Sequence, residues 1–283
     1  MIPFDFEYHK PTSLAEAIEL FAQLTEQGKE PLYYGGGTET ISFSRLYQLF
    51  PRAVIDIKGI PECNTLAYRA GKLVIGAAAT LSQIQESNMF PLLSWCGGRV
   101  ADHTIRNKIT LGGNICSRIP YREAILALLV SDCELIIWGQ QGQRRVTIGQ
   151  AYNQALLLEQ GELLVQIVLD QQITKMPFVS MKKTADGLVN YPQDRIGYPV
   201  VSAAALKKDD QISFAFSGLC NFPFRSRELE TLLNHPGLSL AERVNRAAQY
   251  LPSNILSDMA GSAAYREFVW QNMLTTMLEN LEG

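Results

Sequence analysis

The chain has 283 residues, of which 47% are hydrophobic and 19% charged, and its formal net charge at pH 7 is −3. This composition is typical of an ordinary soluble globular protein with room for two or three compact units. The acidic balance gives no electrostatic case for binding nucleic acid or an anionic membrane. The longest unbroken apolar run, residues 124–130, is far below the roughly 18 residues that a membrane span needs, so none is expected.

The cysteines and histidines show no metal-ligand spacing. The five cysteines are scattered without a Cys-x-x-Cys pair, which excludes a disulfide framework and an iron–sulfur or zinc motif on this chain. The three histidines are equally scattered, so no metal site is expected. The opening Met-Ile-Pro-Phe-Asp-Phe-Glu carries acid where a secretory signal carries basic residues, and we therefore expect a cytoplasmic protein.

The first region, residues 1–58, alternates between helix and strand. Ser13-Leu-Ala-Glu16 is typical of a capping box, and apolar residues then follow at helical spacing until Gly28. A strand at 32–34, a helix at 41–50 and a strand at 54–57 complete a βαβ-like unit. This lobe is predicted to be α/β in character.

The second region, residues 59–170, favours antiparallel pairing. A hairpin is expected at 65–76, a capping box at Thr80 to Gln83, and a buried helix that begins at Pro120. A second hairpin at 133–148 and a strand at 162–169 make this lobe α+β.

The third region, residues 171–283, changes from strands to helices. Strands are expected at 178–183, 200–207 and 211–216, and helices at 226–233, 239–250 and 260–281. This order predicts a separate C-terminal α+β domain, and an α+β fold class for the chain.

The first glycine turn lies in Pro-Leu-Tyr-Tyr-Gly-Gly-Gly-Thr-Glu, residues 31–39. A short strand runs into three glycines, and a threonine stands where a helix begins. Glycines let backbone N–H groups approach a ligand, and a helix N-terminus adds partial positive charge, so a pyrophosphate suits this turn. A tight turn without ligand fits the same residues. The spacing departs from Gly-x-Gly-x-x-Gly, which disfavours an ordinary Rossmann site.

A second glycine turn reads Thr110-Leu111-Gly112-Gly113-Asn114. Each of the two turns has a hydroxyl residue and a further polar side chain beside it. Together they could approach one extended phosphate ligand from two sides.

At these turns the sequence resembles the FAD-binding (medium) subunit of molybdenum hydroxylases, the group that includes xanthine dehydrogenase and aerobic carbon monoxide dehydrogenase. The matching stretches are Gly-Gly-Gly-Thr-Glu at 35–39 and Ile-Arg-Asn-Lys-Ile-Thr-Leu-Gly-Gly-Asn at 105–114. Further likeness at 54–57, 73–77 and 261–266 spreads the resemblance over essentially the whole chain.

The resemblance implies two α+β lobes that bind FAD between them, a fold related to the p-cresol methylhydroxylase flavoproteins, plus a C-terminal domain of sheet and helices. The two glycine turns would hold the pyrophosphate and the ribityl chain. A family acidic residue falls on Glu123, and a family lysine falls at Ser180, near Lys182. The implied cofactor-binding residues are Tyr33, Tyr34, Gly35, Gly36, Gly37, Thr38, Glu39, Thr40, Thr110, Gly112, Gly113, Asn114, Glu123 and Lys182.

The last two of these residues depart from the family pattern. Glu123 replaces the usual Asp, and it also fits a first-turn acid favoured by the helix dipole. Lys182 is offset from the family position, and it also fits a solvated strand lysine.

The resemblance also implies partners. A large subunit would carry molybdopterin and oxidise a substrate such as a purine, carbon monoxide or an aldehyde. A small subunit would carry two [2Fe–2S] clusters, and electrons would pass through FAD to NAD⁺ or another acceptor. The chain itself shows no acid–base pair or nucleophile constellation, which fits a subunit that is active only within a complex.

Two other functions stay open at this point. One is a stand-alone flavoenzyme of the same fold, similar to the UDP-N-acetylmuramate reductases, whose proton donor we do not find here. The other is a cofactor-free assembly protein, which the intact glycine turns disfavour.

Overall fold

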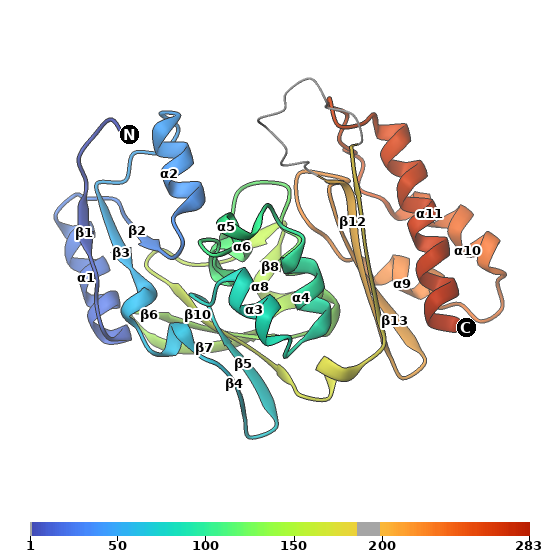
Figure 1. Ribbon diagram of the computed structural model, residues 1–283, viewed down its shortest axis with the longest axis horizontal. Coiled ribbons are helices and arrows are strands. Elements are labelled where there is room, and N and C mark those ends of the chain that lie inside the picture. Colours follow the sequence, from blue (N-terminus) through green and yellow to red (C-terminus); the bar gives the residue numbers. More distant parts are fainter. Residues whose placement is uncertain (1, 186–198) are drawn as a thin grey trace. The chain divides into compact units, whose positions relative to one another are not determined.

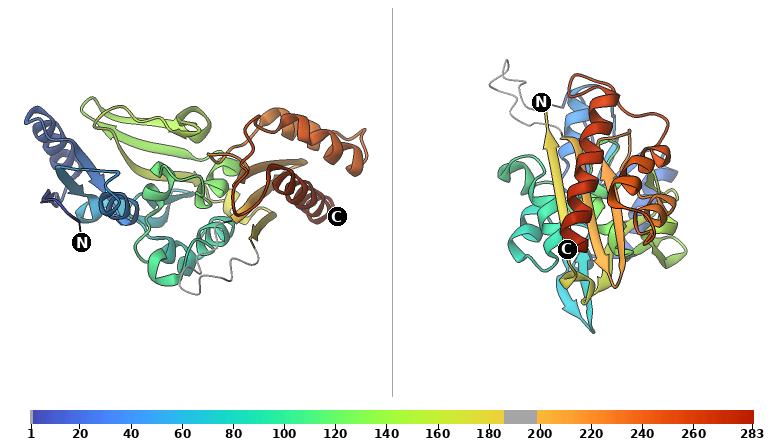
Figure 2. Two further views of the ribbon diagram at one scale, coloured as in Figure 1. Left: turned by 90° about the horizontal axis from the view of Figure 1, so that it is seen from above. Right: turned by 90° about the vertical axis from the view of Figure 1, so that its right-hand side faces the viewer.

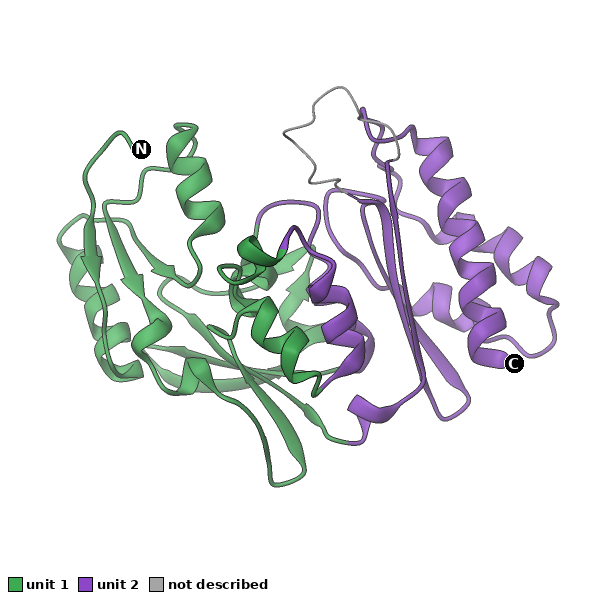
Figure 3. Cartoon of the chain, viewed as in Figure 1, with its two compact units in different colours: residues 1–89, 103–117, 132–171 green, residues 90–102, 118–131, 172–283 purple. Residues whose placement is uncertain are grey.

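The computed structural model describes residues 2–185 and 199–283. The chain divides into two compact units (Figure 3), which are considered separately. Two stretches from the middle of the chain, 90–102 and 118–131, cluster with the C-terminal residues 172–283 in unit 2, and the other described residues form unit 1. The predicted boundaries at residues 58 and 170 stay predictions.

The first sheet of unit 1 is parallel and has the strand order β1-β3-β2. Helix α1 begins where expected, because the Ser13 side chain accepts a hydrogen bond from the N–H of Glu16. The predicted βαβ unit is confirmed: β2 and β3 are parallel and α2 connects them. The elements, labelled in Figure 1, are β1 (Glu7–His9), α1 (Leu14–Glu26), β2 (Pro31–Tyr34), α2 (Thr38–Arg45) and β3 (Ala53–Asp56).

The second sheet of unit 1 is antiparallel throughout, with the order β4-β5-β10-β6-β7. Both predicted hairpins are present, and Thr80 and Gln83 form the predicted capping box of α3. The elements are β4 (Leu66–Arg69), β5 (Lys72–Gly76), α3 (Leu81–Ser87), α5 (His103–Arg106), α6 (Leu111–Cys116), β6 (Glu134–Gly139), β7 (Gly142–Thr147), α8 (Ile148–Ala151), β8 (Tyr152–Asn153), β9 (Ala155–Leu156) and β10 (Leu163–Asp170).

Unit 2 is built on the antiparallel sheet β11-β12-β13. Helix α11 runs along this sheet (Figure 2, right), and Trp270 meets Phe216 edge to face, with ring centroids 5.7 Å apart. Sheet and helix residues share one apolar core. The elements are α4 (Pro91–Gly98), α7 (Ala124–Ser131), β11 (Phe178–Thr184), β12 (Pro199–Lys208), β13 (Gln211–Ser217), α9 (Arg227–Leu233), α10 (Leu240–Ala247) and α11 (Ala263–Glu282).

These elements confirm the α+β class. Within the described ranges, no helix combines the length and the apolarity that crossing a bilayer requires.

Two helices differ from their predicted extents. Helix α2 ends at Arg45 rather than near residue 50, because the chain turns into a left-handed conformation at Tyr47 (φ 57°). The helix predicted from Pro120 begins only at Ala124. The carbonyl of Pro120 instead accepts a hydrogen bond from Ser217 Oγ at 3.1 Å, so this stretch is held to β13 rather than wound into a helix.

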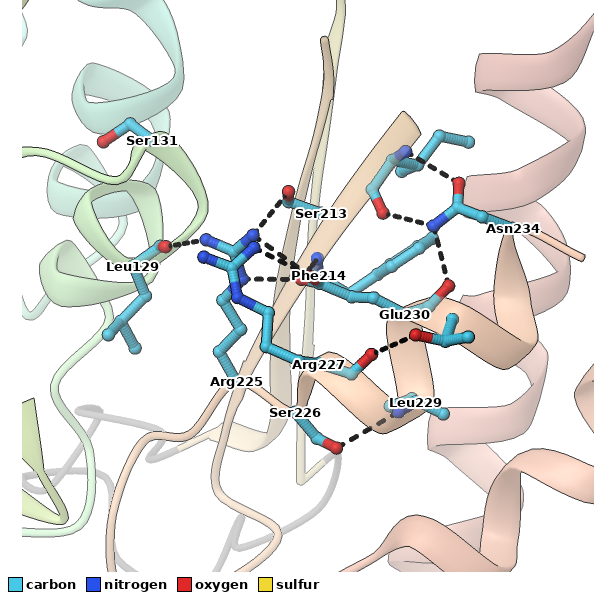
Figure 4. A network of polar contacts seen from close by, with 12 residues as sticks. Leu129, Ser131, Ser213, Phe214, Arg225, Ser226, Arg227, Leu229, Glu230 and Asn234 are labelled. Atoms are coloured by element: carbon cyan, nitrogen blue, oxygen red, sulfur yellow. Dashed lines mark hydrogen bonds and ion pairs between the residues drawn. The ribbon is translucent and has the colours of Figure 1, made fainter. Parts of the chain in front are cut away.

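A buried ion pair joins three elements of unit 2 (Figure 4). Arg225 Nε lies 2.6 Å from Glu230 Oε1, and the two side chains are 7% and 9% exposed. Arg225 also donates to Leu129 O at the end of α7 and to Ser213 Oγ on β13, while Glu230 accepts the N–H of Phe214 at 2.8 Å. Each buried polar group here has a partner, as burial requires.

We predict that Glu230→Ala lowers the free energy of unfolding by about 3–5 kcal/mol, because it leaves the buried Arg225 without its carboxylate. Arg246→Ala is the matched control, since Arg246 and Glu242 form an exposed pair 3.9 Å apart; its effect should stay within about 1 kcal/mol. Urea unfolding followed by circular dichroism measures both, and equal effects would contradict the prediction.

Candidate functional site

The first glycine turn connects β2 to α2 in unit 1. Gly37 adopts φ +70° and stands at the N-cap of α2. Because Gly37 has no side chain, the N-cap residue itself makes no side-chain cap bond to this helix end. A helix that begins after a glycine is suited to binding an anion through its first backbone N–H groups.

The glycines of this turn are needed because the two glycine turns pack against each other. A Cβ on Gly36 would lie 1.5 Å from Lys108 O, and one on Gly35 would lie 2.6 Å from Thr110 Oγ1. A Cβ on Gly37 would lie 2.0 Å from the hydroxyl of Tyr34. Residues about seventy positions apart in the sequence are thus brought into backbone contact, as two turns sharing one ligand require.

The second glycine turn offers its side chains rather than its backbone. The N–H groups of Leu111, Gly112, Gly113 and Asn114 all donate within the chain. Their acceptors are Ala79 O, Ala77 O, Thr110 Oγ1 and Thr110 O, at 2.8, 2.8, 3.2 and 2.9 Å.

Two features of the second turn suit a ligand. Asn114 is 5% exposed, and its Oδ1 has no hydrogen-bond partner among the described residues. Such a buried acceptor is costly unless a donor meets it. A Cβ on Gly113 would meet only Thr110 Oγ1, at 2.9 Å, and otherwise open space. The turn therefore combines an unpaired buried amide oxygen on Asn114 with an exposed glycine at position 113.

The side chains of Tyr33 and Tyr34 have different surroundings. Tyr33 stacks on Phe21 and donates its hydroxyl to Gly161 O at 2.9 Å, and burial raises the pKa of Tyr33. Both the ring and the hydroxyl of Tyr33 therefore make contacts within unit 1. Tyr34 borders a cavity of about 100 Å³, which Thr40 and Ser44 also line.

Glu123 and Lys182 form an ion pair within unit 2. Lys182 Nζ lies 3.1 Å from Glu123 Oε1, and the side chains are 14% and 6% exposed. Lys182 also donates to Arg99 O at 2.7 Å. The solvated-lysine interpretation is therefore wrong, because this lysine is largely buried and paired. Ser180, at the family's lysine position, lies 3.5 Å from Cys96 Sγ instead.

The predicted site residues fall into two groups. Residues 33–40, Thr110 and residues 112–114 lie together in unit 1, while Glu123 and Lys182 lie together in unit 2. Their contact with a cofactor stays a proposal. In the described ranges, no group of three or more His, Cys, Asp or Glu side chains could hold a metal ion.

Sequence reasoning missed Lys58, whose Nζ lies 2.7 Å from Gly35 O. The available signal was its position two residues beyond β3, the strand that pairs in parallel with β2. Carboxyl ends of parallel strands share one edge, so a residue there can reach the glycine turn.

The fold matches a solved structure over nearly its full length. It superposes on a chain of the carbon monoxide dehydrogenase from Hydrogenophaga pseudoflava with a TM-score of 0.85, at 24% sequence identity, covering 99% of this chain and 98% of that one. At this identity the match defines the fold alone.

Sequence comparisons identify the family. The carbon monoxide dehydrogenase medium chain of Hydrogenophaga pseudoflava is 30% identical over 173 residues, which is 59% of this chain and 59% of that one. The xanthine dehydrogenase FAD-binding subunit of Escherichia coli O157:H7 is 26% identical over 93% of this chain and 89% of its own. The family described as "FAD binding domain in molybdopterin dehydrogenase" matches residues 4–170, and the chain belongs to this family. The predicted family, fold class and FAD cofactor are confirmed.

The residues present fit FAD. The start of α2 suits a pyrophosphate, and the unpaired Asn114 Oδ1 suits a hydroxyl donor of the kind that the ribityl chain carries.

We predict that Gly36→Ala and Gly113→Val separate folding from cofactor binding. Gly36→Ala should lower the free energy of unfolding by about 3 kcal/mol, because its Cβ overlaps the carbonyl of Lys108. Gly113→Val should lower it by only about 1 kcal/mol, because its Cβ lies 2.9 Å from Thr110 Oγ1, yet abolish FAD retention, because a branched side chain occupies the space that the glycine leaves for the ligand.

Gly149→Ala in α8 is the control for both variants, since its Cβ meets nothing within 4 Å. Flavin absorbance per protein and the unfolding midpoint are the readouts. Full flavin content in a folded Gly113→Val chain would refute the placement.

We predict that Lys182→Met lowers the free energy of unfolding by about 3–5 kcal/mol, since it strands the buried Glu123 carboxylate. The double variant Lys182→Met/Glu123→Gln should recover part of this loss. Lys175→Met, at an exposed lysine of unit 2, should be neutral within about 0.5 kcal/mol. Thermal melts of the unaltered chain and the three variants test this prediction. A Lys182→Met chain as stable as the unaltered one would count against a buried pair.

Proposed function

We propose that this chain is the FAD-binding subunit of a xanthine dehydrogenase-like molybdenum hydroxylase complex. A large subunit with molybdopterin oxidises the substrate, and a small subunit carries two [2Fe–2S] clusters. The observation that carries this proposal is the family match over residues 4–170, which includes both glycine turns. The names of the relatives, a medium chain and an FAD-binding subunit, support a multi-subunit assembly.

FAD supplies the exchange between single electrons that arrive from the clusters and electron pairs that leave to NAD⁺ or another acceptor. The chain's own part is to bind and orient this cofactor. The first turn of α2 would hold the pyrophosphate through its N–H groups and through the hydroxyl of Thr38. On the other side, Asn114 orients the sugar-alcohol chain, and the absence of a side chain at Gly113 leaves it room.

The family resemblance also counts the buried pair of Glu123 and Lys182 among the cofactor-binding residues in this proposal. Lys182 Nζ and Glu123 Oε1, 3.1 Å apart, hold each other in a fixed direction, which suits polar contacts to a cofactor. The longer Glu reaches where the family uses Asp, and the lysine stands two residues along the same strand face from Ser180.

The test is electron delivery in the reconstituted complex under anaerobic conditions. With clusters reduced chemically by dithionite and excess reductant removed, we expect NAD⁺ or an artificial two-electron acceptor to be reduced only when the FAD-loaded chain is present. Undiminished electron delivery without the chain would refute the proposal. Reduction of UDP-N-acetylenolpyruvylglucosamine by the lone chain with NADPH would instead support the stand-alone flavoenzyme.

A further inference from the structure

Lys58 places its ammonium group at the first glycine turn. Its Nζ lies 2.7 Å from Gly35 O and 2.8 Å from Asp56 Oδ1. An ammonium has three N–H donors, and these two oxygens use two of them. The side chain is 40% exposed. One donor and an accessible positive charge therefore remain beside the turn.

Asp56 positions the Lys58 ammonium through an ion pair. The carboxylate is 2% exposed, caps the short helical turn after β3 by accepting the N–H of Lys58 at 2.9 Å, and accepts the hydroxyl of Tyr8. Burial by itself raises the pKa of Asp56, but the bonds from Lys58 and Tyr8 outweigh it and hold that pKa below its usual range. The bond to Asp56 raises the pKa of Tyr8 to about 12, so its hydroxyl remains a donor. The Asp56 carboxylate thus has two partners besides the Lys58 ammonium, the Tyr8 hydroxyl and the backbone N–H of Lys58.

Tyr34 connects the lysine to the end of the turn. Lys58 Nζ lies 4.7 Å from the centroid of the Tyr34 ring, a cation–π distance. The hydroxyl of the same ring reaches the position where a Cβ of Gly37 would stand. Carboxylate, carbonyl and aromatic ring thus hold the ammonium at the glycine turn that leads into the N-terminus of α2.

We propose that Lys58 is a phosphate-binding residue of the FAD site, and that Asp56 and Tyr34 are its positioning residues. This inference rests on the proposed function of the glycine turns. The third N–H of Lys58 donates to a pyrophosphate oxygen, so that a full positive charge adds to the partial charge of the α2 N-terminus.

A purely structural lysine, which only ties Gly35 to Asp56, is the competing interpretation. Lys58→Gln separates the two, because an amide can still donate to a carbonyl but carries no charge. Lys58→Arg keeps the charge, and Lys72→Met removes a lysine from the exposed ion pair with Asp170 in the same unit. Fluorescence titration of each full-length chain with FAD, and separately with riboflavin, gives the affinities.

We expect Lys58→Gln to weaken FAD binding about tenfold to a hundredfold, as loss of a hydrogen bond to a charged group does. The loss should shrink as sodium chloride rises toward about 1 M, because salt screens an exposed charge pair. Riboflavin, which has no phosphate, should bind both chains equally. Lys58→Arg should retain most of the affinity, and Lys72→Met all of it.

Equal FAD affinity in Lys58→Gln and the unaltered chain overturns the assignment, as does an equal loss for riboflavin and FAD. Should Lys58→Gln fail to fold, Asp56→Asn, which removes the carboxylate that positions Lys58, decides by the same comparison: a loss for FAD without a loss for riboflavin supports the assignment, and equal affinities overturn it. Failure of the unaltered chain to bind FAD would contradict the proposed function itself, whereas undiminished FAD affinity in Lys58→Gln contradicts only the role of Lys58.

Discussion

The contact between the two glycine turns is the constraint on which the site depends. The backbone at Gly36 lies against the carbonyl of Lys108 so closely that even a methyl group would overlap it. This contact joins the parallel sheet that carries β2 and the segment that leads into α6. Because Leu111 and Gly112 are in turn hydrogen-bonded to the residues after β5, the antiparallel sheet is tied to the same point. The contact between Gly36 and Lys108 thus brings the start of α2, the Asn114 amide and Lys58 into one region of unit 1.

Several charged side chains that are buried in unit 2 have charged or carbonyl partners. The guanidinium of Arg266 is completely buried, and it donates to Val200 O and Gly218 O at 2.6 Å and to Asp258 at 2.6 Å. The Arg225 guanidinium likewise donates to Leu129 O of α7 and to Ser213 Oγ of β13. Such groups connect carbonyls of separate elements, and removing one partner of a buried ion pair costs more than the pair itself contributes. The pair of Glu123 and Lys182 follows the same rule, and in our proposal it also serves the cofactor.

Much of the fold could be predicted from local signals. Capping residues such as Ser13 and Thr80 fixed helix starts, and alternating apolar residues gave the antiparallel sheets. The helix predicted to begin at Pro120 shows the limit of local signals. The hydroxyl of Ser217 donates to the carbonyl of Pro120, and a partner about a hundred residues away leaves no local signal.

For the site, the glycines predicted where both turns lie but not why glycine is needed at each position. The sequence suggested room for a phosphate, whereas the structure shows that Gly36 makes room for Lys108. Lys58 was missed because its position two residues beyond β3 becomes informative only once β3 is known to pair with β2, and no local pattern contains that pairing.

The most direct test of the central claim, that the joined glycine turns bind FAD, uses the unaltered chain. The full-length protein is purified, its visible absorption is recorded before and after incubation with FAD, and any released cofactor is identified by mass. The account predicts a flavin spectrum, a released mass equal to that of FAD, and about one flavin per chain. A folded chain that stays colourless after incubation with FAD would contradict it.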